Sequence, residues 1–221
     1  MVDLLEFSQP RRTTHQFVRE TLRQAILSGA LAGGTRLVQA DVAAQLDVST
    51  TPVREALRDL VADGLILFDP HRGAIVRELD MTELVEVYEI RKALEALAIR
   101  RAAERITDQQ LAAAKVLQDK MDVETDSVAW ADLNRQFHAL LEDAAGSPRL
   151  VAITKSLQDT AAIYVAHSIK VEPKRIKAGN REHKALIAAL RGRDGDRAAQ
   201  VLVEHLDHTL GLILASPSTG R

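Results

Sequence analysis

One stretch of the sequence decides the fold of the first part of the chain: Val48-Ser49-Thr50-Thr51-Pro52-Val53-Arg54-Glu55-Ala56-Leu57-Arg58-Asp59-Leu60. Its apolar residues recur at helical spacing, which predicts a helix over about 50–62. Pro52 fits in the first turn of this helix, because the N–H that proline lacks would have no intrahelical partner there. Ser49 or Thr51 is expected to provide the side-chain oxygen that caps the helix.

A shorter helix is predicted over 39–46, with Asp47 in the turn that follows it. The two helices and their turn have the spacing of a helix-turn-helix. Asp47 stands where glycine is frequent, and aspartate is one of the few other residues that tolerate a positive φ. Small Ala43 lets the helices approach, and the residues expected to share their core are Leu46, Val48, Val53 and Leu57. A plain helical hairpin has the same spacing, so the spacing alone does not establish DNA binding.

The flanking segments complete a winged helix-turn-helix. Residues 14–27 have apolar positions at helical spacing and end before Gly29. After Gly64, two short apolar runs at 65–68 and 73–77 predict a β-hairpin. Three helices and this small hairpin form the predicted N-terminal domain, residues 1–77, and residues 78–80 form the predicted linker.

Exposed polar residues gather at the start of the 50–62 helix. The N-terminus of a helix offers free N–H groups and a partial positive charge to phosphates. Arg54 can bind a phosphate or the edge of a guanine, whereas Arg58 can equally pair with Glu55 one turn back. The residues predicted here to contact DNA are Arg36, Ser49, Thr50, Thr51, Arg54, Arg58, His71 and Arg72.

The rest of the chain is predicted to be entirely helical. Glycine, proline and polar residues separate six helical patterns, and Thr107 with Gln110 has the spacing of a capping box. The predicted helices span 81–105, 108–123, 126–145, 148–169, 172–191 and 195–215. They form an all-α bundle over residues 81–215, so that the fold class of the whole chain is mainly α.

Composition excludes several classes of protein. The 221 residues contain no cysteine, which excludes disulfides and thiolate metal sites. No apolar run approaches the roughly 20 residues that span a bilayer, and the N-terminus lacks the pattern of a signal peptide. The net charge of −2 gives no overall basic field. We therefore expect a cytoplasmic protein without membrane contact.

Histidines in the bundle predict a metal site. Asn134 and His138 are four residues apart and lie on one face of a helix, while His183 and His205 lie on later helices. Three imidazoles and one oxygen can converge inside a bundle and bind a divalent ion, most suitably zinc or nickel. His167 and His208 compete for the same role, and seven histidines scattered over the surface remain the simpler alternative.

The motifs of both domains resemble those of a known family. Gly34-Thr35-Arg36-Leu37, the 48–60 segment and Gly64-Leu65-Ile66 resemble the winged helix of the GntR family of bacterial transcription regulators. The resemblance implies that Ser49, Thr50, Thr51 and Arg54 occupy contact positions of the recognition helix. It also implies that Arg72 and Gly73 form the tip of the wing.

The helical half resembles the FCD effector-binding domain of the FadR-like branch of that family. The motifs that carry the resemblance are Glu89-Ile90-Arg91-Lys92-Ala93-Leu94-Glu95, Asn134-Arg135-Gln136-Phe137-His138, Glu182-His183 and Glu204-His205-Leu206. Metal-binding members use an aspartate and three histidines at the corresponding places, which implies a site formed by Asn134, His138, His183 and His205. Here a neutral asparagine replaces the aspartate.

Effectors in this branch are small organic acids or sugar acids. Arg91 is a candidate to bind an effector carboxylate through a bidentate fork, although it can also pair with Glu95 on a solvated face. Tyr164 and Trp130 are candidates to line the pocket, and both are equally suited to a hydrophobic core.

The sequence thus predicts a transcription regulator, in particular a repressor, that binds a two-fold symmetric DNA operator as a homodimer and responds to a small carboxylate. The alternative is a metal-dependent enzyme acting on a small carboxylic acid, because three histidines with an open coordination position also suit catalysis. That alternative leaves residues 1–77 unexplained, so no enzymatic activity is expected.

Overall fold

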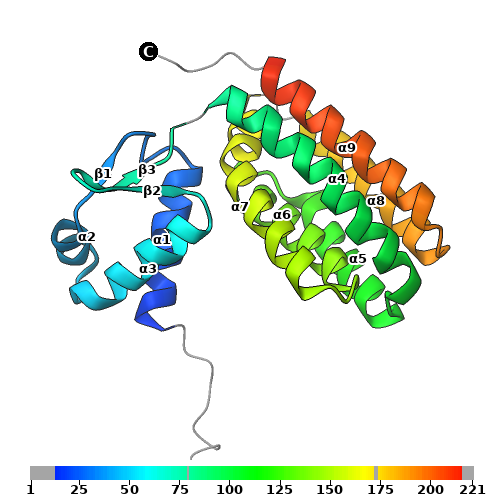
Figure 1. The fold of residues 1–221 in the computed structure, drawn as a ribbon, viewed down its shortest axis with the longest axis horizontal. Helices are drawn as coiled ribbons and strands as arrows, with labels where there is room; N and C mark the ends of the chain where they lie inside the picture. Colours follow the sequence, from blue (N-terminus) through cyan, green and yellow to red (C-terminus); the bar gives the residue numbers. More distant parts are fainter. Residues whose placement is uncertain (1–12, 79, 172–173, 216–221) are drawn as a thin grey trace, which may run out of the picture.

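The computed structural model describes residues 13–78, 80–171 and 174–215, and at positions 163, 167, 170 and 171 it describes the backbone alone. Over these ranges the chain has two parts, a small mixed part and a bundle of long helices (Figure 1). The predicted fold class is confirmed. Of the predicted domain limits, residues 1–12 and 79 lie outside the described residues.

The first part combines three helices with a small sheet. Its elements are α1 (Thr14–Leu27), β1 (Arg36–Leu37), α2 (Gln39–Leu46), α3 (Thr50–Ala62), β2 (Ile66–Asp69) and β3 (Gly73–Val76). The strands form an antiparallel sheet in the order β1-β3-β2, in which Ile75 pairs with Leu67 on one side and Arg36 on the other. The predicted hairpin is confirmed, but the sheet has a third strand. Two residues are too few for β1 to show an alternating pattern in the sequence.

The core of this part forms as the helix-turn-helix pattern predicts. Val53 and Leu57 of α3 are buried, and Leu46 and Val48 pack partly buried against the same cluster. Asp47 has φ 52° and ends α2 in the left-handed conformation, as expected. The cap prediction is wrong: Ser49 occupies the N-cap of α3 but makes no side-chain capping hydrogen bond.

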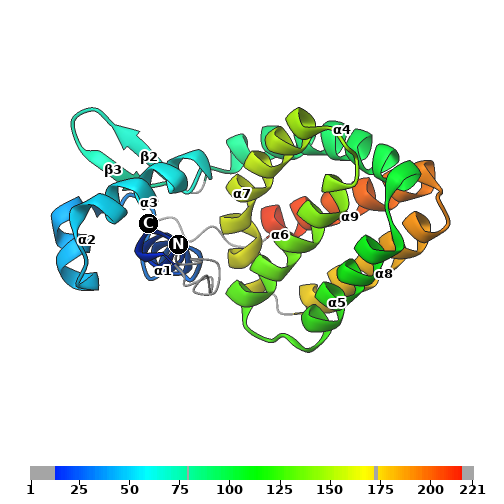
Figure 2. The same cartoon turned by 90° about the horizontal axis from the view of Figure 1, so that it is seen from below.

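Six helices form the second part, close to the predicted ranges. They are α4 (Met81–Arg105), α5 (Asp108–Val123), α6 (Ser127–Asp143), α7 (Pro148–Val171), α8 (Arg175–Arg191) and α9 (Gly195–Ala215). The end of α6 comes two residues before the predicted one, because the chain turns there through Gly146 at φ 62°. In both views α7 lies on the side of the bundle that faces α1 (Figure 1, Figure 2).

Side-chain caps fix where the bundle helices begin. Asp80 accepts hydrogen bonds from the backbone N–H groups of Thr82 and Glu83 at the start of α4. Thr107 and Gln110 form the predicted capping box of α5. Asp126 caps α6 in the same way as Asp80 caps α4. These caps satisfy backbone N–H groups that would otherwise lack a partner in the first turn of each helix.

Candidate functional site

The start of α3 presents a polar surface. Ser49, Thr50, Thr51, Arg54 and Arg58 are all exposed. Among the described residues, neither arginine has an ion-pair or hydrogen-bond partner, so the predicted alternative pair of Arg58 with Glu55 does not form. Two free guanidinium groups thus flank a helix N-terminus, an arrangement suited to phosphates and base edges.

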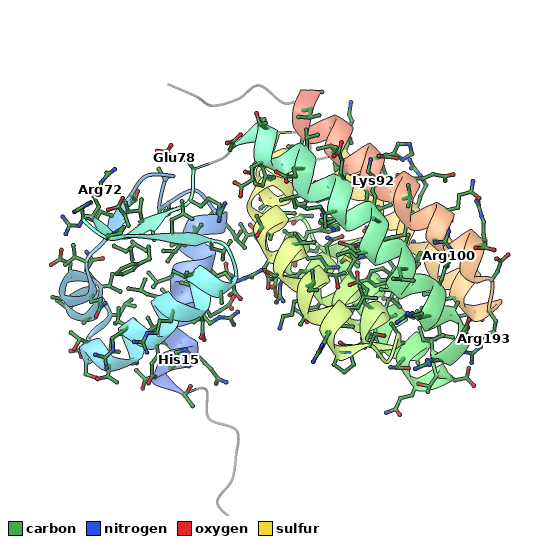
Figure 3. The ribbon with its side chains drawn as sticks, in the orientation of Figure 1. His15, Arg72, Glu78, Lys92, Arg100 and Arg193 are labelled. Carbon is green, nitrogen blue, oxygen red and sulfur yellow. The ribbon has the colours of Figure 1, made fainter. Side chains whose placement is uncertain are left out.

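The β2–β3 hairpin holds a second basic group at its tip. The Asp69 carboxylate accepts hydrogen bonds from the backbone N–H groups of His71 and Arg72, both at 2.7 Å, and these bonds lower its pKa. Gly73 follows at φ 80°, a backbone conformation that residues with a Cβ rarely adopt. Arg72 therefore points away from the helical bundle at the free end of the small part (Figure 3). Arg36 is exposed on β1 of the same sheet.

Three predicted metal ligands meet inside the bundle. His138 of α6, His183 of α8 and His205 of α9 are 3%, 1% and 5% exposed. One ring nitrogen from each lies within 4.8 Å of the corresponding nitrogens of the other two. The His183 ring also lies parallel to the Trp130 indole, with centroids 6.0 Å apart. The prediction that these three histidines converge is confirmed by this geometry.

Hydrogen bonds orient two of the rings. His183 Nδ1 lies 3.1 Å from Gln118 Oε1, and His205 Nδ1 lies 2.7 Å from Glu182 Oε2. In each case the bonded Nδ1 leaves Nε2 as the nitrogen available to the site. The Nε2 atoms of His138 and His183 are buried and have no hydrogen-bond partner within the described part of the chain.

Burial keeps the three imidazoles in the form that binds metal. Desolvation lowers the pKa of His138 and His183 well below the usual histidine value, and neighbouring positive groups add to the effect. The pKa of His205 is lowered by burial too, although its hydrogen bond to Glu182 opposes the shift. Neutral rings are required because a protonated imidazole nitrogen cannot coordinate a cation.

Asn134 lines the same cavities as His138 and His205 and offers an oxygen as a fourth donor. Its Oδ1 atom is buried without a hydrogen-bond partner among the described residues, as are the two Nε2 atoms. A buried carbonyl oxygen without a partner is costly, and a cation or a ligand would satisfy it. The donor set therefore fits a divalent ion. His208, the predicted alternative, is largely exposed and bonds to Glu182, while the side chain of His167 lies outside the described residues.

Sequence reasoning missed the groups that support these ligands. Glu182 accepts hydrogen bonds from His205 and His208. Burial by itself raises the pKa of Glu182. The two hydrogen bonds and the charge of Arg175 outweigh burial and lower this pKa to about 2. Gln118 was missed as well. Glu182 stands in the Glu-His motif beside His183, so its position was visible in the sequence even though its partner was not.

A buried carboxyl pair lies next to His138. Glu95 of α4 and Glu142 of α6 each place an oxygen within 4.8 Å of a ring nitrogen of His138. Glu142 accepts hydrogen bonds from Gln158 and Thr154, and burial together with Glu95 raises its pKa well above the usual carboxyl value. The raised pKa means that Glu142 resists ionisation, which limits the repulsion between the two carboxyl groups.

Arg91 is buried, in contrast to the predicted solvated pair. Its Nε atom donates to Glu95 Oε1 at 2.6 Å, and its guanidinium lies over the Tyr88 ring at 4.7 Å. The i,i+4 pair of Arg91 with Glu95 does form. It is buried rather than solvated because α9 packs along α4. Arg91 also lines both small cavities beside the histidines.

These two cavities flank Asn134, and each has a volume of about 20 Å³. The first is lined by Tyr88, Arg91, Trp130, Asn134, Arg175 and His205, among others. The second is lined by Arg91, Asn134, Arg135, His138 and Gln158, among others. Trp130, a candidate pocket residue in the sequence, thus lines the first cavity.

Tyr164 does not line either cavity, which corrects its predicted role. Its hydroxyl accepts from the backbone N–H of Asp80 at 2.9 Å and donates to the Asp80 carbonyl at 3.0 Å. The ring therefore anchors the start of α4 on α7. An aromatic residue in the middle of a long helix gives no indication in the sequence of which neighbour it faces.

The fold and the site together define a class of protein: a winged helix-turn-helix DNA-binding domain joined to a helical ligand-binding domain. Residues 14–76 match the family of bacterial regulatory proteins named gntR, and residues 86–208 match the FCD domain. The chain belongs to the GntR family of transcription regulators with an FCD domain, and it is a DNA-binding transcription regulator.

Relatives with established names agree with this assignment. The chain is 29% identical over 202 residues to the HTH-type transcriptional repressor RspR of Escherichia coli K12, covering 89% of this chain and 87% of that protein. It is 29% identical over 183 residues to the Nta operon transcriptional regulator of Aminobacter aminovorans, covering 82% and 85%. The solved structure of E. coli McbR/YncC aligns with a TM-score of 0.75 at 25% identity, covering 97% of this chain and 99% of that one. Over the described residues, every helix is too short or too polar to span a lipid bilayer.

Proposed function

We propose that the protein is a repressor whose operator binding is controlled by a small carboxylate that binds in a metal-containing pocket of the helical domain. The observation that carries this proposal is the convergence of three buried histidines beside cavities lined by Asn134, where Nε2 of His138, Nε2 of His183 and Oδ1 of Asn134 have no partner among the described residues. Groups of this kind are stable in a protein interior when a bound cation or ligand satisfies them. Repression is proposed because RspR, one of the relatives, is named a repressor.

On the DNA side, α3 would enter the major groove with its N-terminal end. Arg54 would bind a base edge or phosphate, and Thr50 and Thr51 would contact the backbone at the helix start. Arg72 at the wing tip and Arg36 on β1 would bind neighbouring phosphates. Support comes from the exposure of all these residues and from the absence of ion-pair partners for Arg54 and Arg58 within the described residues.

On the ligand side, His138, His183 and His205 would hold a divalent ion, zinc or nickel, with Asn134 as a weak fourth ligand. Such an ion supplies an open coordination position that attracts a carboxylate oxygen. Glu182 and Gln118 fix two imidazole rings so that their Nε2 atoms face the site. The charged side chain of Arg91 lines both cavities and would orient the carboxylate.

The protein is proposed to act as a homodimer. One winged helix reads only a short half-site, and two copies related by a two-fold axis would read half-sites about one helical turn apart. A regulator of chromosomal genes acts where the DNA is, so the proposed location is the cytoplasm. Sedimentation equilibrium at micromolar concentration should give the mass of a dimer, and a monomer with and without DNA would contradict this part of the proposal.

The decisive experiment measures metal, DNA and turnover on one preparation. Native mass spectrometry of protein purified without chelator should show one divalent ion per chain. Gel-shift titration against promoter fragments should then show sequence-specific binding that a carboxylate weakens. The same carboxylate should be recovered unchanged after incubation with the metal-loaded protein. Conversion of the carboxylate would favour the metal-dependent enzyme instead, and no metal after addition of zinc or nickel would remove the metal from the proposal.

A further inference from the structure

A network of ion pairs connects the DNA-binding domain to the helix that carries Asn134 and His138. Arg23 of α1 is 2% exposed, and its Nη1 atom lies 2.8 Å from Oδ1 of Asp132 on α6. Burial raises the pKa of Asp132, but the charges of Arg23 and Arg135 outweigh this effect and lower it. Asp132 is therefore ionised near pH 7 and links both domains.

Arg135 takes part in this network and also lines a cavity. Its Nη2 atom lies 3.1 Å from Asp132 Oδ1, and its Nε atom lies 3.7 Å from Oδ1 of Asp159 on α7. The Nε atom is buried and has no hydrogen-bond partner within the described ranges. The same side chain lines the cavity that contains Asn134, His138 and Gln158. One guanidinium thus lies between the pocket and the domain interface.

The cavity beside Arg135 is suited to an anionic oxygen. Its volume of about 20 Å³ has room for one water-sized group. Nε of Arg135 is a buried donor without a partner at this cavity, whereas the unpartnered Oδ1 of Asn134 is an acceptor that suits the proposed cation. Arg91 lines the cavity too, but its Nε atom is already bonded to buried Glu95. Arg135 is the cavity residue whose charge also faces the interface.

Two carboxylates on opposite sides of that interface act on each other. Burial raises the pKa of Asp159, Arg135 lowers it, and the Asp63 carboxylate at the end of α3 raises it again. Asp63 belongs to the DNA-binding domain and is paired with Arg19, whose Nη2 lies 2.5 Å from its Oδ2. Two arginines offset the repulsion between these carboxylates where α1 packs on α7: Arg19 beside Asp63 and Arg135 beside Asp159. Of the two, Arg135 is supplied by the helical domain.

We propose that Arg135 is an effector-binding residue and that it couples the pocket to the DNA-binding domain. An anionic oxygen in the cavity draws the guanidinium away from Asp132 and Asp159. Asp159 then lacks the neighbouring positive charge of Arg135, so it repels Asp63 more strongly. The DNA-binding domain loosens from α7 as a result. This inference rests on the proposed function, because it specifies how a carboxylate in that pocket acts on operator binding.

Hydrogen–deuterium exchange of the full chain tests the proposal, with acetate as the probe because it presents a carboxylate oxygen on a small molecule. The wild-type protein, with and without added zinc, is compared at matched ionic strength in acetate and in chloride. Acetate should raise exchange in residues 14–27 several-fold. The variant Arg135→Gln should show the raised exchange already in chloride, with no further change in acetate. Arg100→Gln removes an exposed ion pair with Asp196 and should behave like the wild type.

A second variant keeps the test decisive if Arg135→Gln is poorly stable. Adding Asp159→Asn to Arg135→Gln removes the uncompensated carboxylate and should restore slow exchange in residues 14–27. Three results would overturn the inference: no acetate effect in the wild type, an unchanged acetate effect in Arg135→Gln, or no restoration in the double variant. Gel shifts report separately on the proposed function, since sequence-specific DNA binding in the wild type does not depend on any of these exchange results.

Discussion

His205 and Glu182 form a hydrogen bond of 2.7 Å between Nδ1 and Oε2, and Glu182 precedes the second buried histidine, His183, in the chain. One dipeptide of α8 therefore serves two purposes. His183 turns its Nε2 atom into the site, while its neighbour fixes the ring of His205 on α9. The side chain of Glu182 is one-fifth exposed, and its pKa of about 2 keeps it ionised near pH 7.

Replacing Glu182 should weaken metal binding without removing a ligand. In Glu182→Gln the charge that fixes the His205 tautomer is lost, so we expect the affinity for zinc to fall about 10–100-fold, as for other residues that support metal ligands. Competition with a chromogenic chelator measures this affinity. His208→Ala is the matched control, because it removes the exposed partner of the same carboxylate and should leave the affinity nearly unchanged. Equal losses in both variants would contradict the supporting role.

The ligands themselves should behave differently from their neighbours. Alanine at His138, His183 or His205 should abolish stoichiometric metal, because each removes one of three imidazole ligands. The carboxylate response should be lost with the metal, while operator affinity without carboxylate changes little. Asn134→Asp should tighten metal binding by adding a negative charge next to the cation. Elemental analysis of each purified variant is the measurement, and full metal content in any of the alanine variants would exclude that histidine.

The sequence predicts the helices and the converging histidines well, because both depend on periodic spacing along single helices. It does not predict the partners of those histidines. Gln118 is 65 positions from His183, and Glu182 is 23 positions from His205. Burial is equally hidden: the i,i+4 spacing of Arg91 and Glu95 is the same on a solvated face and in the interior. The packing of α9 and α7 on α4 decides between them, and no local pattern encodes that packing.

Arg54→Ala should abolish specific operator binding and leave the fold intact. The side chain is exposed on α3 and has no partner in the described part of the chain, so its removal breaks no internal contact. Loss of a bidentate base contact costs about 1–3 kcal/mol of binding free energy. Gel-shift titration at fixed salt measures the loss, with circular dichroism to confirm the fold. Unchanged affinity would show that Arg54 does not contact the operator.

Acid should destabilise the metal-free protein through the buried histidines. Their pKa values are lowered in the folded state, so below about pH 6.5 the unfolded chain binds more protons than the folded one. Stability is therefore full above pH 6.5 and falls below it, by about 1 kcal/mol per histidine at pH 5.5 if the folded rings stay neutral. Urea unfolding at pH 7.5 and 5.5 measures the difference. His183→Asn should reduce the loss by about a third, and a loss unaffected by this change would contradict the assignment.

Gly64 should be more sensitive to substitution than another glycine of the same conformation. It lies in the turn after α3 at φ 72°, and a Cβ there would collide with Oγ1 of Thr160 on α7. Gly29 has φ 79°, but a Cβ there meets nothing within 4 Å. Gly29→Ala should therefore cost only backbone strain, about 1–3 kcal/mol of unfolding free energy. Gly64→Ala should cost more, because it also pushes the DNA-binding domain away from α7.

The double variant Gly64→Ala with Thr160→Ala separates these two effects. Removing the hydroxyl relieves the collision and leaves the strain at φ 72°, so urea unfolding of the double variant should return to the level of Gly29→Ala. If Gly64→Ala is no more destabilising than Gly29→Ala, the turn after α3 does not press against α7 in solution. In that case the ion pair of Arg23 with Asp132 holds the two domains together, rather than close packing at this turn.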